Sequence, residues 1–292
     1  MKERQIIALE HLSIHKFLTS SQFVQLNLYK NRGEVTNTLK ELLESRKPLI
    51  GKKNFKPDPT YGKVESIYYL TQHGKNYLVK NFNHLAENIK FIKKEINLFQ
   101  REYQHRRSTV DFNIGLYQWI QRGDGEIIFS HYYFDKKGNN HSNDKSNHLY
   151  ALNRLELKDG KSFIPDMITM FNIKGKEYLY LFEQNNDYST TRLVNELVPY
   201  LNAISDGLFE NIFGFKRSPR IAVVCKDETV KYNLLKRLRT DKRFKYFNNL
   251  FIFKSNDELL NNFDQNWTLI DGQKVSFIQP QKTHYPLTHN HE

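Results

Sequence analysis

The chain has 292 residues, 39% of them hydrophobic and 14% aromatic, so it can bury a substantial core, and its length predicts two domains. Lys and Arg (44) exceed Asp and Glu (32), a net charge of +12 that favours an anionic partner, with nucleic acid preferred over a membrane surface. No segment approaches the roughly 18 consecutive apolar residues of a membrane span, and the N-terminus lacks the apolar core of a signal peptide. We therefore expect no membrane insertion and a cytoplasmic location.

The first third of the chain carries most of the positive charge. Residues 1–100 contain 17 Lys/Arg and 9 Asp/Glu, a net of +8, whereas residues 101–292 contain 27 and 23, a net of +4. Apolar spacing predicts three helices, around Ile6 to Leu12, Phe23 to Leu26 and Val35 to Leu43. Two short strands follow, PLIG and VESIYYLT, joined by the basic loop KKNFKPDPTYGK. Three helices followed by a two-stranded wing predict a winged helix over residues 1–80.

In a winged helix the third helix enters the major groove and the wing contacts the DNA backbone. An alternative is that the module docks to protein. For DNA contact, the candidates on the third helix and its start are Asn31, Arg32, Thr36, Asn37 and Lys40, and those on the wing are Lys52, Lys53 and Lys56.

The rest of the chain alternates helix and strand patterns. Residues 81–104 have apolar spacing that predicts a long linking helix, and residues 105–275 predict a second domain with a mixed β-sheet flanked by helices. This domain contains a polar insert, KKGNNHSNDKSNH, and the basic helix VKYNLLKRLRTDK. Residues 276–292 are expected to form a flexible tail. The overall fold class is therefore mixed, α+β and α/β.

Two carboxylates mark the segment FIPDMITMFNIKGKEYLYLFEQNND. It predicts a hairpin with a two-residue turn at Lys174 and Gly175, which places Asp166 directly opposite Glu183. A three-residue turn is the alternative and would make the two acids diagonal neighbours. Like charges at cross-strand distance repel each other, so the pair favours a bound cation. Hard divalent ions take one or two carboxylates and leave other positions to water and phosphate, so we expect Mg²⁺ or Mn²⁺.

These residues also carry a family resemblance. The letters IPD, followed by an apolar strand and EQN, resemble the PD-(D/E)XK core of restriction-type nucleases. With the winged helix and the helix QHRRSTVDFNIGLYQWI, the chain from about residue 5 to 255 resembles the replication-relaxation family and the C class of plasmid mobilisation relaxases. The resemblance implies a restriction-endonuclease-like second domain that nicks one strand at a plasmid transfer origin with a divalent metal and without a covalent tyrosine. Double-stranded DNA with an origin-like site would be the partner, and other relaxosome or coupling proteins are further candidates.

The motif departs from the family at one position. Asn185 stands where the usual lysine would follow Glu183 by two residues, and an amide cannot polarise water as an ammonium does. Either another basic residue stands in, with Arg192, Lys174 and Lys176 as candidates, or the domain is a catalytically inactive DNA-binding relative.

The helix and strand before the hairpin offer further site residues. Asp111 is the preferred third acid because Gly115, one turn on, leaves room for an ion. His105 is a candidate phosphate contact or proton relay, and Glu126 is a weaker candidate acid. Asp111 and His105 can equally be ordinary surface residues of that helix.

Two classes of function therefore remain. The first is an enzyme, a metal-dependent, strand-specific DNA nickase of conjugative mobilisation. The second is a plasmid replication or transfer regulator that only binds DNA. A restriction-type endonuclease that cuts both strands is a third possibility.

Overall fold

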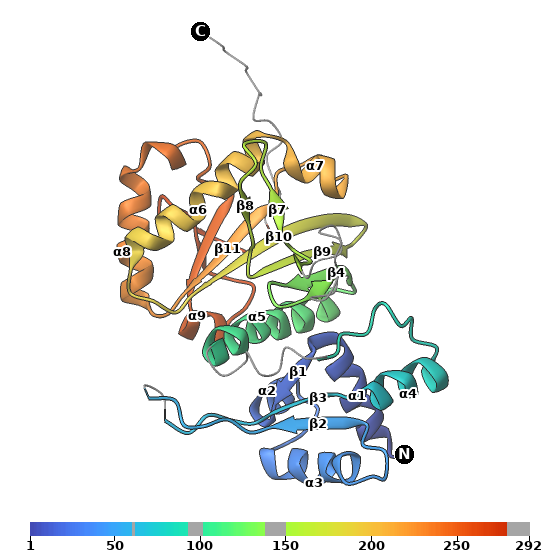
Figure 1. Cartoon of the computed structure of the whole chain (residues 1–292). Coiled ribbons are helices and arrows are strands. Elements are labelled where there is room, and N and C mark those ends of the chain that lie inside the picture. The colour runs from blue at the N-terminus through green and yellow to red at the C-terminus, as the bar shows by residue number, and fades with distance from the viewer. Residues whose placement is uncertain (60–61, 93–101, 138–149, 279–292) are drawn as a thin grey trace. The chain divides into compact units, whose positions relative to one another are not determined.

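The computed structural model describes residues 1–59, 62–92, 102–137 and 150–278. Two compact units are present (Figure 1): unit 1 comprises Met1–Ile127 with Asn172–Gly175, and unit 2 comprises Ile128–Phe171 and Lys176–Glu292. The fold combines helices with a large mixed sheet, as the sequence predicted.

Unit 1 begins with helices and short strands in alternation. Thr19 and Asn31 cap α2 and α3 by accepting the backbone N–H of Gln22 and Glu34. The ring of Tyr69 packs over Gly51 in β2, and a Cβ there would lie 2.5 Å from the end of that ring and displace it. The strands form an antiparallel sheet in the order β1-β3-β2. The elements are α1 (Glu3–His15), β1 (Phe17–Thr19), α2 (Ser20–Gln25), α3 (Arg32–Leu43), β2 (Ile50–Lys53), β3 (Ile67–Leu70), α4 (Gln72–Phe82) and α5 (Tyr103–Arg122).

The linking helix expected over residues 81–104 is not continuous. α4 ends at Phe82 because Asn83 takes a left-handed conformation (φ 54°), and residues 83–92 are not helical. Ile89 and Ile92 are buried, and Lys90 N–H donates to the carbonyl of Ser13 at 2.8 Å, so this segment packs within unit 1. The remaining predicted helical residues, 93–101, lie outside the described part of the chain.

α5 belongs to unit 1, so the units divide after Ile127 and not at residue 104. Polar side chains of α5 explain the difference, because they bond to α1 and α2. Asn113 Nδ2 lies 3.1 Å from His15 Nδ1, and Gln118 Nε2 donates to the carbonyl of Gln25 at 2.8 Å. Such partners are not visible in an apolar periodicity.

Unit 2 is built on a seven-stranded mixed sheet, to which β4 also belongs, in the order β14-β13-β12-β11-β10-β9-β4. Strands β10, β11 and β12 are parallel, and β12, β13 and β14 are antiparallel. The strands are β4 (Glu126–Tyr132), β9 (Met167–Ile173), β10 (Lys176–Asn185), β11 (Arg220–Cys225), β12 (Phe251–Ser255), β13 (Trp267–Thr268) and β14 (Lys274–Val275).

Helices connect the parallel strands, and four short strands precede the hairpin. These strands form two-stranded pairs, β5 with β6 and β7 with β8. The remaining elements are α6 (Thr190–Ser205), α7 (Leu208–Phe213), α8 (Glu228–Thr240), the 3-10 helix η4 (Lys242–Phe244), α9 (Asn256–Asn261), β5 (Lys136–Lys137), β6 (Tyr150–Ala151), β7 (Leu155–Glu156) and β8 (Ser162–Phe163).

The β9–β10 hairpin has the predicted two-residue turn. β9 ends at Ile173, β10 begins at Lys176, and Lys174 and Gly175 both have positive φ, 52° and 74°. Two residues with positive φ are the signature of a type I′ turn, whose twist matches paired strands. The three-residue alternative is therefore wrong.

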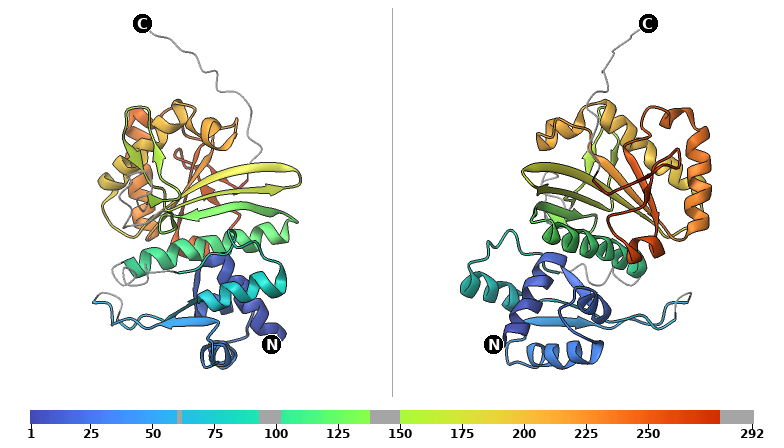
Figure 2. Two further views of the ribbon diagram at one scale, coloured as in Figure 1. Left: turned by 45° about the vertical axis from the view of Figure 1, so that its right-hand side comes forward. Right: turned by 180° about the vertical axis from the view of Figure 1, so that it is seen from behind.

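The two faces of the sheet are covered differently, as the turned views show (Figure 2). On one face, odd-numbered residues of β10, such as Leu179 and Leu181, pack with Leu197 of α6 and Leu234 of α8. On the other face, aromatic rings pack together: Tyr180 stacks on Phe277 with ring centroids 4.4 Å apart, the ring of Phe171 is tilted against Tyr180, and the rings of Phe263 and Trp267 are tilted against Phe277. Glu183 and Asn185, being odd-numbered, belong to the α6 face.

The C-terminal tail starts later than expected. Phe277 is fully buried, and its carbonyl accepts hydrogen bonds from Tyr180 Oη and, at 2.7 Å, from Arg220 Nη1. Residues 276–278 are therefore part of the fold, and residues 279–292 lie outside the described part.

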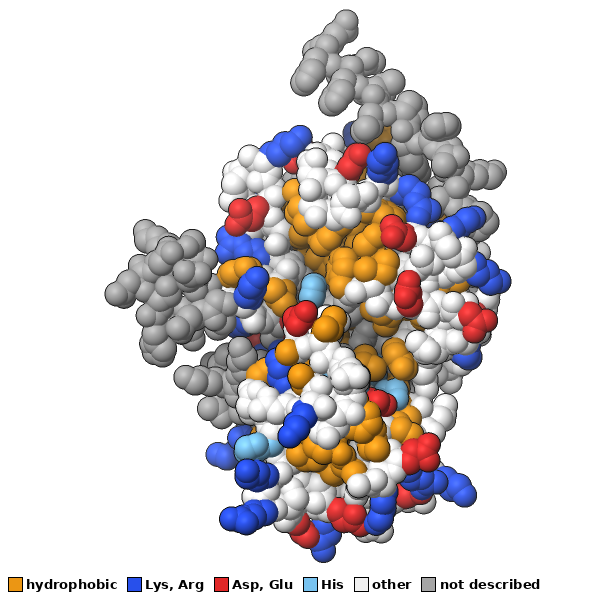
Figure 3. Space-filling model, turned by 90° about the vertical axis from the view of Figure 1, so that its right-hand side faces the viewer, with side chains coloured by type: hydrophobic (Ala, Val, Ile, Leu, Met, Phe, Trp, Pro, Cys, Tyr) orange, Lys and Arg blue, Asp and Glu red, His pale blue; other side chains and the backbone are white. Residues whose placement is uncertain are grey.

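Among the described residues no helix has the length and apolar character needed to cross a membrane. Large apolar side chains reach the surface of unit 2, including Ile128, Ile164 and Ile212, and Figure 3 shows apolar and charged side chains side by side on one face. The single cysteine, Cys225, is buried in β11.

Candidate functional site

Asp166, directly before β9, is held by two hydrogen bonds of its own and by one to the residue before it. Its backbone carbonyl accepts from Tyr133 N–H at 2.9 Å, and its Oδ2 accepts from the backbone N–H of Gln184 at 2.7 Å. Asn153 donates to the carbonyl of the preceding Pro165. The side chain is 7% exposed. The hydrogen bond to Gln184 places Asp166 beside β10 at the level of Glu183, in agreement with the predicted pairing.

Glu183 lies on the α6 face of β10 and is partly exposed. Its Oε1 accepts a hydrogen bond from the hydroxyl of Tyr200, which is itself 1% exposed and packs edge-on against Phe163 with ring centroids 4.8 Å apart. Tyr200 comes from the apolar stripe of α6, so the same helix face that forms the core also delivers one polar group to the acid.

The electrostatics of the pair are unfavourable for two ionised acids. Burial, followed by the nearby carboxylates of Asp166 and Glu196, raises the pKa of Glu183 well above its usual value, against the opposing effect of the Tyr200 hydrogen bond. Burial and the Glu183 carboxylate raise the pKa of Tyr200 well above 10. Tyr200 therefore stays protonated and acts as a donor.

Of the two polar atoms of the Asn185 side chain, Oδ1 has a hydrogen-bond partner and Nδ2 has none among the described residues. Oδ1 accepts from the backbone N–H of Asp187 at 3.0 Å, which fixes the side-chain orientation. Nδ2 is buried and has no hydrogen-bond partner among the described residues. An unsatisfied buried donor costs about 1–3 kcal/mol, so this atom is suited to receive a ligand acceptor.

Polar side chains gather where the parallel strands β10, β11 and β12 end. Gln184 Nε2 donates to Asn186 Oδ1 at 3.0 Å and to Asn256 Oδ1 at 3.2 Å, and Asn256 Nδ2 donates to the carbonyl of Lys226 at 3.3 Å. The carboxyl ends of parallel strands are the usual ligand-binding edge of such sheets. The acid pair lies at this end, since Glu183 and Asn185 pair with Val223 and Cys225.

The basic residues considered as substitutes for the missing lysine either lie far from Glu183 or form ion pairs with other acids. Arg192, exposed at the start of α6, lies 2.7 Å from Glu196 and 3.6 Å from Asp187. Lys174 and Lys176 are wrong as candidates, because they lie at the turn, and Lys176 is seven residues from Glu183 along β10, about 23 Å at about 3.3 Å per residue.

The two earlier acids, Glu126 and Asp111, have different outcomes. Glu126 is wrong as a candidate, because Gly125 lies against Asn172 at the turn end of the hairpin whereas Tyr133 reaches Asp166 at the other end. Asp111 accepts from Gln22 Nε2 at 2.8 Å and lies 3.9 Å from Arg107 Nε, both in unit 1.

The role of Asp111 as a ligand, and that of His105 as a phosphate contact or proton relay, stay predictions. His105 lies partly buried in the first turns of α5, where its carbonyl accepts from Thr109 Oγ1 at 2.9 Å.

The predicted DNA-contacting residues lie on α3 and on the strand and loop that follow it. Arg32, Thr36, Asn37 and Lys40 are exposed on α3, where Arg32 Nη1 lies 2.8 Å from Glu65. Asn31 has a structural role as the cap of α3. In β2 and the loop, Lys52 and Lys56 are exposed and Lys53 is partly buried.

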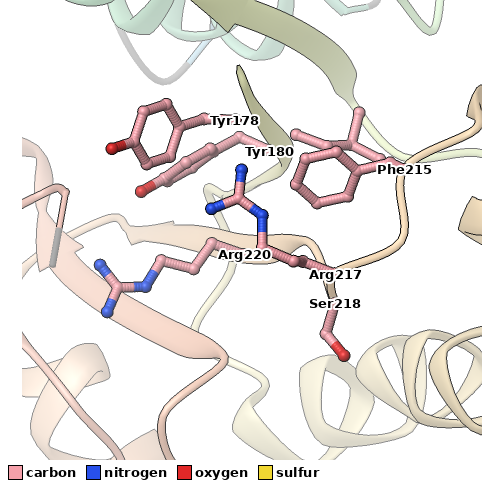
Figure 4. A pocket seen from close by; sticks show the side chains of 7 residues that line it. Tyr178, Tyr180, Phe215, Arg217, Ser218 and Arg220 are labelled. Carbon is pink, nitrogen blue, oxygen red and sulfur yellow. The ribbon is translucent and has the colours of Figure 1, made fainter. Parts of the chain in front are cut away.

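A small pocket lies at the opposite end of β10 from the acid pair (Figure 4). Its cations are engaged within the fold: the guanidinium of Arg217 lies 5.6 Å from the ring centroid of Tyr178, and Arg220 bonds to the carbonyl of Phe277. The pocket therefore anchors the last described residues against β10. Its lining residues are Tyr178, Leu179, Tyr180, Phe215, Arg217, Ser218 and Arg220.

The acid pair offers two carboxylates to a divalent cation. Within the described residues no group of three or more His, Cys, Asp or Glu side chains is arranged to hold a metal. Two hard carboxylates with repelling charges, one partly exposed, nevertheless fit Mg²⁺ or Mn²⁺, which keep water or phosphate in their remaining positions. The orphan amide of Asn185 is a further sign of an external polar partner.

Three residues near the pair were missed by reasoning from sequence. Tyr200 and Glu196 are hidden in an amphipathic helix, and Asn153 lies in a loop 12 residues before Pro165. The only sequence signal was a polar hydroxyl within the apolar stripe of α6.

Comparison of the chain with protein-family models, curated proteins and solved structures finds no match in any of the three.

Proposed function

We propose that the chain is a metal-dependent DNA nickase of plasmid mobilisation, acting in the cytoplasm at a transfer origin, with Asp166 and Glu183 as the metal ligands. The observation that carries the proposal is the pairing of these two carboxylates at the carboxyl end of the parallel strands, where the second acid has a raised pKa. Repulsion between two acids in a partly buried site is relieved when a cation binds both.

The fold of unit 2 supports this proposal. The hairpin that carries the acids is embedded in a mixed sheet with helices packed on one face, which is the arrangement expected of a restriction-endonuclease-like domain. The element order of unit 1, three helices with a three-stranded antiparallel sheet, supports a winged helix that would present α3 to double-stranded DNA. Other relaxosome or coupling proteins would be further partners.

The residues of the chain would divide the work as follows. A divalent cation, when bound, supplies a Lewis acid that stabilises phosphodiester charge and lowers the pKa of water. Asp166 and Glu183 bind it, and Tyr200 holds the Glu183 carboxylate in place through its hydrogen bond. Asn185 Nδ2, buried and without a partner among the described residues, donates to a phosphate oxygen or to the attacking water.

A specific observation favours a second candidate, a DNA-binding regulator without catalysis. The position two residues after Glu183 holds an amide, and the nearest basic candidate, Arg192, is already paired with two acids. A restriction-type endonuclease is the third alternative.

One assay separates the three. Purified protein is incubated with supercoiled plasmid carrying the transfer origin of its own element, with Mg²⁺, Mn²⁺ or chelator. Open circles that require metal support the nickase, linear product supports a restriction enzyme, and unchanged plasmid that is nevertheless bound supports the regulator.

Two variants and a matched control connect the assay to the site. Asp166→Asn and Glu183→Gln should each abolish nicking and leave origin binding within about twofold, because a lost metal ligand affects the transition state more than remote phosphate contacts. Glu177→Gln, on the same strand but exposed near the turn, should nick normally. Full nicking by Asp166→Asn or Glu183→Gln would refute the site.

A further inference from the structure

The end of α8 and the helix η4 carry a dense basic surface in unit 2. Residues 236–246 contain six Lys/Arg and one acid, Asp241, a net charge of +5. All six cations are exposed. We call them the α8 basic surface: Lys236, Arg237, Arg239, Lys242, Arg243 and Lys245.

Most of these charges have no acidic partner among the residues that the structure describes. Within the described part of the chain, Arg243 is the one member of the six that forms an ion pair, at 2.6 Å from Asp241, and Arg239 Nε donates to the carbonyl of Ile270 at 2.7 Å. The other four, Lys236, Arg237, Lys242 and Lys245, have no carboxylate within 4 Å among the described residues. Elsewhere in unit 2, cations do find acids, as in the pairs of Lys158 with Asp206, Lys231 with Glu258 and Lys274 with Glu258.

The helix dipole accounts for only part of this charge. Basic residues in the last turn of a helix stabilise it, and Arg237 and Arg239 occupy that turn of α8. The effect fades beyond the last turn, so it does not explain Lys242 and Lys245, which follow the end of the helix.

The apolar residues of α8 and η4 that lie beneath the basic side chains are buried. Leu234, Leu235 and Leu238 of α8 and Phe244 of η4 are at most 5% exposed and belong to the core beside the sheet. The cations therefore project from a fixed surface. For the same reason α8 has no apolar face left to insert into a membrane, as an interfacial helix requires.

Two tyrosines accompany the cations. Tyr232 and Tyr246 are 62% and 69% exposed, and the Lys245 ammonium lies 5.5 Å from the ring centroid of Tyr246. Exposed aromatic rings interleaved with Lys and Arg are characteristic of surfaces that follow a nucleic-acid backbone and stack on sugars or bases.

We infer that the α8 basic surface is a second nucleic-acid contact of this protein, in which Lys236, Arg237, Lys242 and Lys245 bind backbone phosphates independently of unit 1. The inference deepens the proposed function, on which the identity of the nucleic acid as DNA rests. α8 begins just after the strand end near the acid pair, and its 13 residues span about 20 Å, equal to about six base pairs at about 3.4 Å each. The surface would hold DNA that distance from the cleaved bond.

The test uses the full-length protein without metal and with chelator, so that binding is measured in the absence of cleavage. Binding to a fluorescent 30-base-pair duplex and to its single strand is followed by anisotropy across a series of NaCl concentrations. A variant with Lys236, Arg237, Lys242 and Lys245 all changed to Gln should lower the magnitude of the slope of log affinity against log salt by about 3, since each neutralised phosphate contributes about 0.7–0.9. A matched control changes four other exposed lysines of unit 2 to Gln, Lys136, Lys137, Lys176 and Lys216, and should leave the slope unchanged.

Each other outcome overturns the inference. If the wild-type protein binds DNA and the α8 variant has the same salt slope, the α8 basic surface does not contact DNA, and the proposed function is unaffected. An equal decrease of the salt slope in the control variant means that binding depends on net charge and not on the position of these four cations. Absence of DNA binding by the wild-type protein removes both proposals. The wild-type protein and the α8 variant are also tested on vesicles of phosphatidylserine and phosphatidylcholine. If the variant loses vesicle binding and keeps its DNA binding, the surface binds membranes instead. Thermal unfolding of each variant verifies that it is folded.

Discussion

The hydroxyl of Tyr200 donates a hydrogen bond to Oε1 of Glu183, which ties α6 to β10 at the acid pair. The raised pKa of Tyr200 keeps its proton in place, so the bond persists when Glu183 ionises. A donor of this kind favours the charged form of the carboxylate and so opposes the effects that keep it protonated.

Tyr200→Phe should weaken metal binding while leaving the packing against Phe163 intact. A hydrogen bond to a charged group contributes about 1.5–3 kcal/mol, so we expect about a tenfold or greater loss of Mn²⁺ affinity by calorimetry. Tyr178→Phe, at the other end of β10, is the matched control and should bind Mn²⁺ normally. Equal affinity in Tyr200→Phe and wild type would show that the bond does not support the ligand.

Glu183→Gln should stabilise the metal-free protein above neutral pH. Because the folded-state pKa of Glu183 is raised above its usual 4.5, the favourable contribution of this group is complete below about pH 4.5 and is lost as the pH rises through the folded pKa. Glutamine stays neutral, so the variant avoids this loss. Urea unfolding at pH 5, 7 and 9 should show a growing advantage over wild type, and a constant difference at all three values would contradict it.

Mn²⁺ binding should release a proton and strengthen with pH. The raised pKa of Glu183 favours its protonated form when no metal is bound, and a carboxylate ligand must lose its proton before it binds. Titration calorimetry in two buffers of different ionisation enthalpy should detect proton release at pH 6 to 7 that Glu183→Gln eliminates. Binding with no proton release at any pH would contradict a shared cation at this pair.

Asn185→Lys and Arg192→Ala test which group replaces the usual lysine. If the position after Glu183 accepts a cation, Asn185→Lys should keep or raise nicking, because the ammonium faces the metal and the phosphate. If the basic function has moved to α6, Arg192→Ala should lower nicking by about 10²-fold. We expect the first result and little effect of the second, since Arg192 is paired with Glu196 and Asp187. Inactivation by Asn185→Lys would instead show that the site needs the amide.

Unit 1 should lose stability in mild acid because of two histidines of α1, the partly buried His11 and the buried His15. Burial lowers the pKa of His11 to about 4, and burial, then His11 and Lys90, lowers that of His15 well below 6.5. Their contribution is therefore present above about pH 6.5 and is lost as the pH falls through the folded pKa values, by about 1.4 kcal/mol per pH unit for each proton. His15→Gln should show a shallower loss between pH 6.5 and 4.5 in urea unfolding. A slope equal to that of wild type would exclude His15 as a source.

The turn of the hairpin and the strand face that carries its second acid follow from local sequence, whereas Mg²⁺ or Mn²⁺ at the acid pair stays a prediction. A Lys-Gly pair between two apolar strands has few alternatives to a type I′ turn, and the alternation of side chains then puts Glu183 and Asn185 on one face. The helix and strand order of residues 105–275 was predictable for the same reason, since periodicity is a local property.

The surroundings of the acids and the boundary between the units depend on tertiary packing. Tyr200 and Glu196 reach Glu183 because α6 packs across the sheet, and α5 joins unit 1 because Asn113 and Gln118 find partners on α1 and α2. Neither fact has a signature in composition or spacing. A hydrogen bond between residues about 100 positions apart depends on packing of the whole core, whereas a turn or an amphipathic stripe depends only on neighbouring residues.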